Sequence, residues 1–166
     1  LGFVVGGSAP EGEVSVARAG SEHLFGVVLF NDWSARDIQG FEYVPLGPYL
    51  GKSFASSISL WVVPWEALAA ARVTPPAREH QLAEYLDDSQ EPWALDITME
   101  VELDGEVVSH PPVKELYWTA PQMVAHMTVN GASLRPGDFF GSGTVSGDKR
   151  EQRGSFMELS WGGKEP

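Results

Sequence analysis

The chain has 166 residues, of which 43% are hydrophobic, enough for one domain with a buried core. Eleven Lys and Arg against 23 Asp and Glu give a formal net charge of −12, which argues against nucleic acid or anionic lipid as partners, since both bind clustered cations. No apolar run reaches the roughly 20 residues of a membrane-spanning helix, and the absence of cysteine excludes disulfides and thiolate chemistry and favours a reducing, cytoplasmic location.

The first third of the chain contains three apolar runs that are typical of strands. Leu1–Val5 has the pattern of a strand already under way, and Leu1 is not an initiator Met, so we expect a piece of a longer polypeptide. Leu24–Phe30 is almost continuously apolar, which predicts a strand covered on both faces. A second such run, Ser57–Val63, ends at a proline.

The middle of the chain combines a short helix, a loop and a hairpin. Trp65–Arg72 is rich in alanine and follows a proline, which favours a helix. Residues 73–93 are polar and predict a long surface loop. Apolar residues alternate with polar ones over 95–103, so a half-buried strand is expected there. Asp104-Gly105 supplies a tight turn, and residues 106–108 return as the partner strand.

The last third is predicted to hold one helix and two closing strands. Thr119 is placed to cap a helix over 120–129, and the strands are expected at Phe139-Phe140 and over Phe156–Trp161. No repeat or internal boundary is visible, so residues 1–166 are expected to form one domain. The fold class is therefore α+β, predominantly β, with two or three short helices.

The segment Asn31–Ser56 carries the most informative set of polar side chains. If a helix begins at Asp32, four different functional groups fall on one face: Asp32, Arg36, Gln39 and Tyr43. The opposite face would pack into the core through Trp33, Ile38, Phe41 and Val44. The alternative is an ordinary amphipathic helix with a solvated polar face and Asp32 as its N-cap.

Three further positions are candidates for chemistry. Lys52 lies between tight turns that would aim its ammonium at a fixed point, although a loop lysine is more often solvated. Thr144 offers a hydroxyl after two glycines, and Glu158 is an acid within an apolar stretch, where a buried charge needs a partner. The four histidines show no metal-ligand spacing, and His126 is expected to be structural.

Several longer segments resemble the fumarylacetoacetate hydrolase family. They are NDWSARDIQ, EYVPLGPYLGKSF and WVVP in the first half, and YWTAPQMVAHMTVNGASLRPGD, GSGTVSG and FMELSW in the second. The resemblance spans nearly the whole chain, and the EYVPLGP insertion is similar to that of the longer members. It implies a mixed β-sandwich or roll, and a C-terminal catalytic domain that is incomplete at its N-terminal side.

The resemblance also implies an activity. The expected reaction is metal-dependent hydrolysis of a carbon–carbon bond in a 1,3-diketo acid, converting 4-fumarylacetoacetate to fumarate and acetoacetate at the end of tyrosine and phenylalanine catabolism. The family uses Mg²⁺ or Ca²⁺ on oxygen ligands and is homodimeric, so the same cofactors and a homodimer are expected here.

By the same resemblance, Asp32 would be a metal ligand, and Lys52 and Ser56 would lie at the positions of a second cation-binding set. The family usually has Thr where Ser56 stands. A pair of glutamate ligands and the water-activating histidine are expected before Leu1, outside this sequence. We therefore expect the segment alone neither to bind Mg²⁺ tightly nor to turn over substrate.

The remaining roles follow the same matching motifs. Arg36, Gln39 and Lys52 would line the oxyanion pocket. Gln39, Tyr43 and Thr144 would contact the substrate. Glu158 would orient the histidine that activates water, which fits a general base held by a carboxylate.

Two alternatives stay open at this point. The first is another activity of the superfamily, an acylpyruvate hydrolase or a decarboxylase of related oxo-diacids. The second is a catalytically inactive metal-binding or scaffold protein, against which the joint presence of Asp32, Arg36, Gln39, Lys52 and Glu158 argues.

Overall fold

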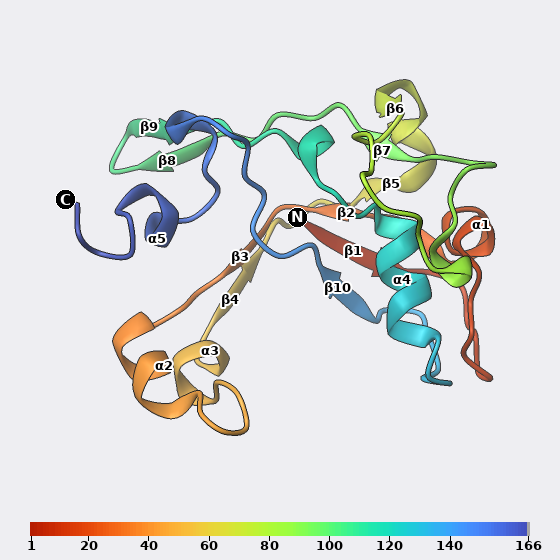
Figure 1. Ribbon diagram of the computed structural model, residues 1–166, viewed down its shortest axis with the longest axis horizontal. Helices are drawn as coiled ribbons and strands as arrows, with labels where there is room; N and C mark the ends of the chain where they lie inside the picture. The colour runs from red at the N-terminus through yellow and green to blue at the C-terminus, as the bar shows by residue number, and fades with distance from the viewer. Residues whose placement is uncertain (166) are drawn as a thin grey trace.

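The computed structural model describes residues 1–165, and its centre is a four-stranded antiparallel sheet. The strand order is β10 (Phe139–Gly141), β1 (Gly2–Val5), β2 (Leu24–Val28) and β5 (Val63–Pro64). The sheet thus joins the beginning of the chain to a strand far along it, since Gly2 pairs with Gly141, 139 residues further on. Figure 1 shows this sheet in the middle of the molecule.

The hydrophobic core lies between this sheet and helix α4 (Ala120–Thr128). Phe3 of β1 and Val124 of α4 belong to one buried cluster, and Val124 has no exposed surface. Trp65 extends the cluster, because its ring packs edge-on against Phe3 at 6.4 Å between centroids and stacks on Trp93 at 4.9 Å. These aromatic contacts connect the sheet to the segment that follows it.

The remaining elements around the core are short. The helices are α1 (Val16–Arg18), the π-helix η1 (Ala19–His23) and the 3₁₀ helices η2 (Trp65–Ala71), η3 (Glu84–Leu86), η4 (Val113–Glu115) and η5 (Arg150–Gln152). Two small antiparallel pairs join β6 (Arg72–Val73) to β7 (Ala94–Leu95) and β8 (Val101–Leu103) to β9 (Glu106–Ser109). A last helix, α5 (Phe156–Leu159), lies near the C-terminus.

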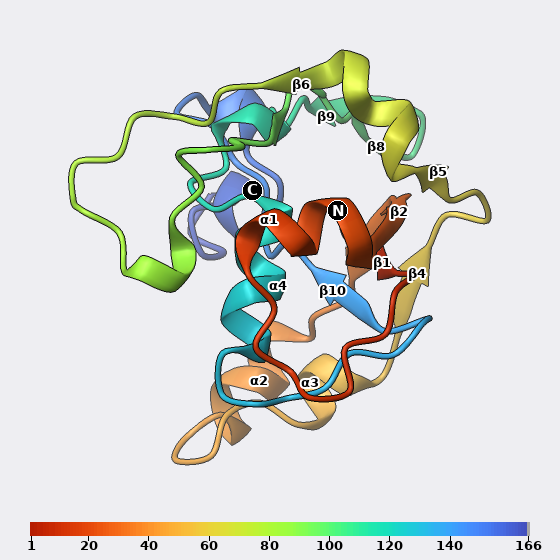
Figure 2. The ribbon, with the colours of Figure 1, turned by 90° about the vertical axis from the view of Figure 1, so that its right-hand side faces the viewer.

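Residues 29–60 form an arm that leaves the central sheet. Two antiparallel strands, β3 (Phe30–Asp32) and β4 (Ser56–Ile58), carry helices α2 (Arg36–Glu42) and α3 (Leu50–Ser53) at their far end. Figures 1 and 2 both show the two helices side by side, and Figure 1 shows them away from α4 and the sheet. The arm therefore holds its helices by its own local contacts and not by the main core.

Predictions that rest on local backbone chemistry are confirmed. Asp104 and Gly105 have φ values of 53° and 87°, the positive angles that the tight turn between β8 and β9 requires. Helix α4 begins where Thr119 predicts, because the Thr119 hydroxyl accepts from the Gln122 N–H and the Gln122 side chain accepts from the Thr119 N–H. The strands at 1–5 and 139–140 and the short helical segment after Pro64 are also present.

The predictions for the longer apolar runs are wrong in part. The run 24–30 divides into β2 and β3, and Leu29 between them is 60% exposed, so it is not covered on both faces. The run 57–63 divides likewise into β4 and β5, and Leu60 is 96% exposed. Both runs leave the sheet to form the arm, and an apolar pattern alone does not say which part of it is buried.

Two other segments differ from their predicted form. Residues 95–103 contain β7, an isolated bridge at Thr98 and β8 rather than one continuous strand. The loop 73–93 includes β6 at its start and η3. The structure is a mixed α/β domain with small antiparallel sheets, and within residues 1–165 no helix is long and apolar enough to cross a membrane.

Candidate functional site

A lysine and an aspartate meet at the base of the arm helices. Lys52 Nζ donates to Asp32 Oδ2 at 2.5 Å and to Ser34 Oγ at 2.7 Å. The Lys52 side chain is 25% exposed and that of Asp32 is 42% exposed, so the pair is partly shielded from water. An ammonium held by two acceptors has a fixed direction, unlike a solvated loop lysine.

Arg36 and Gln39 both lie on α2, the helix that packs against α3. Arg36 Nη1 donates to Gln39 Oε1 at 2.8 Å, the contact expected of residues three apart on a helix. The predicted helix start is wrong, however, because α2 begins at Arg36. Asp32 instead ends β3, where it pairs with Ser56 of β4, and the prediction of Asp32 as an N-cap fails with it.

The predicted core-facing side of this segment is also wrong. No residue of α2 is buried, and the four apolar side chains Trp33, Ile38, Phe41 and Val44 are all exposed, Phe41 to 92%. Trp33 uses its Nε1 to donate to Ser57 Oγ at 2.9 Å, which ties it to β4. Tyr43 follows α2 as its C-cap and is itself 52% exposed.

Helix α3 is fixed against α2 through main-chain contacts. The Ala35 N–H donates to the Gly51 carbonyl at 2.9 Å, and a Cβ at position 51 would lie 2.7 Å from the Gln39 nitrogen. Gly51 is therefore a position where only a glycine permits the two helices to approach so closely. The contact sets where the next residue, Lys52, leaves the backbone.

Glu42 accepts hydrogen bonds from the chain that leads into α3. Its Oε1 receives the N–H groups of Gly51 at 2.6 Å and Tyr49 at 2.8 Å. Desolvation raises the pKa of Glu42, but hydrogen bonds from the N–H groups of Gly51, Tyr49 and Leu50 outweigh it, and the pKa falls below its usual value. The ionised form is thus the one that the fold stabilises.

Glu158 lies in a helix and not in the predicted strand. Ser155 caps α5 by accepting from the Glu158 N–H at 3.2 Å. The Glu158 Oε2 atom in turn accepts from the hydroxyls of Ser155 at 2.7 Å and Ser146 at 2.9 Å. The half-buried carboxylate lines a depression of about 310 Å³ together with Arg153, Met157, Trp161 and Gly162.

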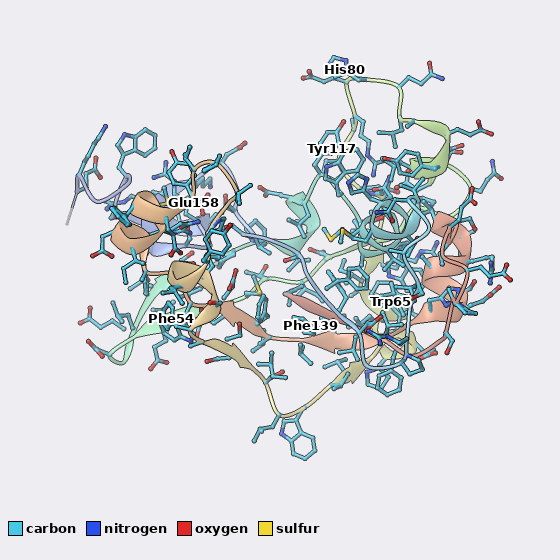
Figure 3. All side chains as sticks on the ribbon, turned by 90° about the horizontal axis from the view of Figure 1, so that it is seen from below. Phe54, Trp65, His80, Tyr117, Phe139 and Glu158 are labelled. Atoms are coloured by element: carbon cyan, nitrogen blue, oxygen red, sulfur yellow. The ribbon has the colours of Figure 1, made fainter. Side chains whose placement is uncertain are left out.

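Within the described residues, no hydrogen bond joins Glu158 or Thr144 to the arm. Figure 1 shows α5 apart from α2 and α3, and Figure 3 labels Glu158 on that helix. In the part of the chain that is described, no hydrogen bond links Glu158 to Lys52 or to a histidine, and Thr144 is exposed. The larger cavity, about 790 Å³, lies in the loop 74–92 and contains none of the predicted site residues.

The donor set of the arm fits part of a divalent-cation site. Asp32 provides a carboxylate, and Ser34 and Ser56 provide hydroxyls, the hard oxygen donors that Mg²⁺ and Ca²⁺ prefer. Among residues 1–165, however, no three His, Cys, Asp or Glu side chains cluster closely enough to hold a metal ion. Within these residues the arm thus offers one carboxylate and two hydroxyls, which is less than a complete metal site.

Four side chains that hold the predicted site residues were not predicted. Ser34 accepts a hydrogen bond from Lys52, and Glu42 accepts one from the Gly51 N–H, next to Lys52. Ser146 and Ser155 donate to Glu158. The spacing Ser155-x-x-Glu158 is the capping-box pattern, so the sequence did contain a signal for α5 and for the serine contact. No comparable signal marks Ser34, Glu42 or Ser146, whose contacts depend on the tertiary fold.

Comparison with known proteins identifies the family. The family model described as fumarylacetoacetate (FAA) hydrolase C-terminal matches residues 1–163. Proteins named fumarylacetoacetase are 46% identical in Homo sapiens (100% of this chain, 41% of the relative), 49% in Caenorhabditis elegans (98% and 40%) and 43% in Arabidopsis thaliana (100% and 41%). The chain thus spans about two-fifths of the length of these relatives. It belongs to the fumarylacetoacetate hydrolase family and corresponds to its C-terminal region.

Proposed function

We propose that the complete protein is a metal-dependent carbon–carbon hydrolase that converts 4-fumarylacetoacetate to fumarate and acetoacetate, the last step of tyrosine and phenylalanine catabolism. Relatives named fumarylacetoacetase are 43–49% identical over nearly the whole chain, which supports this substrate. The observation that carries the proposal is the Lys52 ammonium, held in one direction by Asp32 and Ser34. A fixed cation is what a reaction that develops negative charge requires.

Lys52, Arg36 and Gln39 are proposed to stabilise negative charge during the reaction. Attack of water on the ketone produces an alkoxide, and cleavage of the carbon–carbon bond then expels an enolate. Each preorganised donor aimed at such an oxygen contributes on the order of 3 kcal/mol. The Arg36–Gln39 hydrogen bond supports this role, because it restrains both side chains before substrate arrives.

Glu158 is proposed to orient the water-activating histidine of the complete protein. Both serine hydroxyls bind Oε2, and within residues 1–165 no hydrogen bond reaches Oε1, which can therefore accept from an imidazole N–H. A carboxylate in that place stabilises the imidazolium that forms when the histidine takes a proton from water. Gln39, Tyr43 and Thr144 are proposed as substrate contacts.

Asp32 is proposed as one oxygen ligand of Mg²⁺ or Ca²⁺, with Lys52 and Ser56 beside the cation-binding region. The bound ion would polarise the diketone oxygens and add positive charge to the site. The remaining ligands are proposed to come from parts of the protein outside this sequence, because the chain covers only 41% of its human relative.

The assembly and location are proposals of the same kind. We propose a cytoplasmic homodimer. In each subunit residues 1–166 form the C-terminal domain, and the fold of this domain is a mixed β-sandwich or roll. The exposed apolar side chains of the arm support an association that covers them, since large exposed apolar patches mark interaction surfaces.

The test is a turnover assay on the full-length protein with fumarylacetoacetate and an acylpyruvate as parallel substrates. We expect hydrolysis of fumarylacetoacetate that stops on chelation and returns with Mg²⁺. Faster turnover of the acylpyruvate would assign another activity of the superfamily. Metal binding without turnover of either substrate would favour a scaffold protein.

A further inference from the structure

The position of Lys52 depends on contacts that lie outside the charged pair itself. Lys52 immediately follows Gly51, whose carbonyl accepts from Ala35 and whose Cα faces the backbone of α2 at Gln39. The main chain at this point is therefore held on two sides. The hydrogen bond donated by the Gly51 N–H is a third contact that restrains the backbone at this residue.

The acceptor of the Gly51 N–H is the Glu42 carboxylate. Glu42 is the last residue of α2, and its Oε1 accepts from both Tyr49 and Gly51. The two hydrogen bonds connect the end of the loop between the helices back to the end of α2, where the loop begins. A carboxylate that receives two backbone N–H groups is a strong acceptor, since hydrogen bonds to an ionised group are about twice as strong as neutral ones.

We propose that Glu42 is a positioning residue for Lys52: it holds the backbone of Tyr49–Gly51 against α2, so that the Lys52 ammonium reaches Asp32 and Ser34. The inference rests on the proposed role of Lys52 in the reaction. Glu42 itself uses Oε1 for the backbone and touches neither the Lys52 ammonium nor Asp32 by any hydrogen bond in residues 1–165. Its effect on the reaction is through the lysine.

The geometry distinguishes this role from a general contribution to folding. The arm helices contain one buried residue, Gly51, so no apolar core holds them in place. Without the Glu42 acceptor, the N–H groups of Tyr49 and Gly51 turn to water, and the start of α3 loses two of the hydrogen bonds that hold it on α2. A displacement of about 1 Å at a catalytic group lowers the rate by as much as about 100-fold.

The test compares three variants of the full-length enzyme. Glu42→Ala removes the acceptor, Glu42→Gln keeps an oxygen acceptor at the same place, and Asp37→Ala removes an exposed carboxylate from the same helix as a control. For Glu42→Ala we expect kcat to fall by about 10- to 100-fold with little change in KM, because Lys52 acts on charge that develops in the transition state. Glu42→Gln should restore most of the rate, and Asp37→Ala should retain it.

A second measurement follows the lysine directly. Amine-specific labelling read by mass spectrometry reports the reactivity of Lys52, with Lys114, Lys149 and Lys164 as internal references. Glu42→Ala should raise labelling of Lys52 relative to these three, and Glu42→Gln should leave it near the wild-type value. Because labelling does not need turnover, it decides the role of Glu42 even if the wild-type protein proves inactive on fumarylacetoacetate.

Two outcomes would overturn the proposal. The first is a Glu42→Ala protein with wild-type kcat and wild-type labelling of Lys52. The second is a Glu42→Gln protein impaired as severely as Glu42→Ala, since loss of charge and not of the acceptor would then be the cause.

Discussion

Lys52 donates to Ser34 as well as to Asp32, and Glu158 accepts from Ser146 as well as from Ser155. In each case the sequence indicates only one of the two partners. The resemblance of the NDWSARDIQ and EYVPLGPYLGKSF segments predicts that Asp32 and Lys52 act in one site, and the structure places them in contact. Ser34 and Glu42 are absent from that prediction, because their contacts form only when α3 lies on α2. Sequence motifs thus indicate the reacting groups better than the groups that restrain them.

Replacement of Glu158 by Gln tests the charge of the carboxylate separately from its shape. The amide retains an oxygen for the Ser146 and Ser155 hydroxyls but no longer stabilises a protonated histidine. We expect turnover of the full-length protein to fall by about 100- to 10,000-fold. Mg²⁺ affinity, measured by calorimetry, should not change.

Glu151→Gln is the matched control, since Glu151 is exposed and its side chain makes no hydrogen bond within the described residues. It should keep wild-type turnover. Wild-type turnover of the Glu158→Gln variant would show that the Glu158 carboxylate has no role in the reaction.

At the level of elements, the predictions succeed where the signal is local. Thr119 and Gln122 cap α4, and Asp104-Gly105 makes its turn, because each needs only residues a few positions apart. The closing strand expected at 156–161 is wrong for a related reason: Ser155 and Glu158 form a cap that nucleates α5, and this local signal outweighs the alternation of apolar residues.

Replacing a glycine by alanine is expected to have opposite effects on stability at two positions of the arm helices, one within the contact between α2 and α3 and one outside it. Gly51→Ala places a Cβ 2.7 Å from the Gln39 nitrogen, so the helices must separate. We expect a loss of about 1–3 kcal/mol in unfolding free energy and a fall in turnover. Gly40→Ala meets no atom within 4 Å and should stabilise α2 by about 0.5–1 kcal/mol.

Urea unfolding midpoints of the two variants, measured beside kcat, provide the comparison. If Gly51→Ala kept both the wild-type midpoint and the wild-type kcat, the close approach of α3 to α2 would not matter for Lys52.

Across the whole molecule, the sequence predicts a domain with a core but not which apolar residues enter it. Phe3, Val124 and Trp65 are buried in the main cluster, whereas Phe41 and Leu60 are almost fully exposed on the arm. All five are hydrophobic residues in the sequence. Their burial depends on whether the segment stays with the sheet or leaves it, which is a property of the tertiary fold.

The stability of the domain should therefore respond to α4 according to burial. Val124→Ala removes fully buried methyl groups between the helix and the sheet, and we expect a loss of about 2 kcal/mol in unfolding free energy. Met127→Ala on the exposed side of the same helix, where the residue is 54% exposed, should change it by less than about 0.5 kcal/mol. Thermal unfolding monitored by circular dichroism distinguishes the two; equal shifts would contradict the burial of Val124.

The two-stranded connection of the arm also bears on how the chain tolerates sequence change over evolution. Lys52 and Asp32 lie beyond β3 and β4, outside the buried cluster that contains Val124 and Trp65. Substitutions in that cluster are therefore expected to change the unfolding free energy while leaving the charged pair in place. Changes in the loop after Glu42, by contrast, are expected to act on the pair through the backbone that leads into α3. Changes to the stability of the core and changes to the charged pair are thus expected to arise from different parts of the same 166 residues.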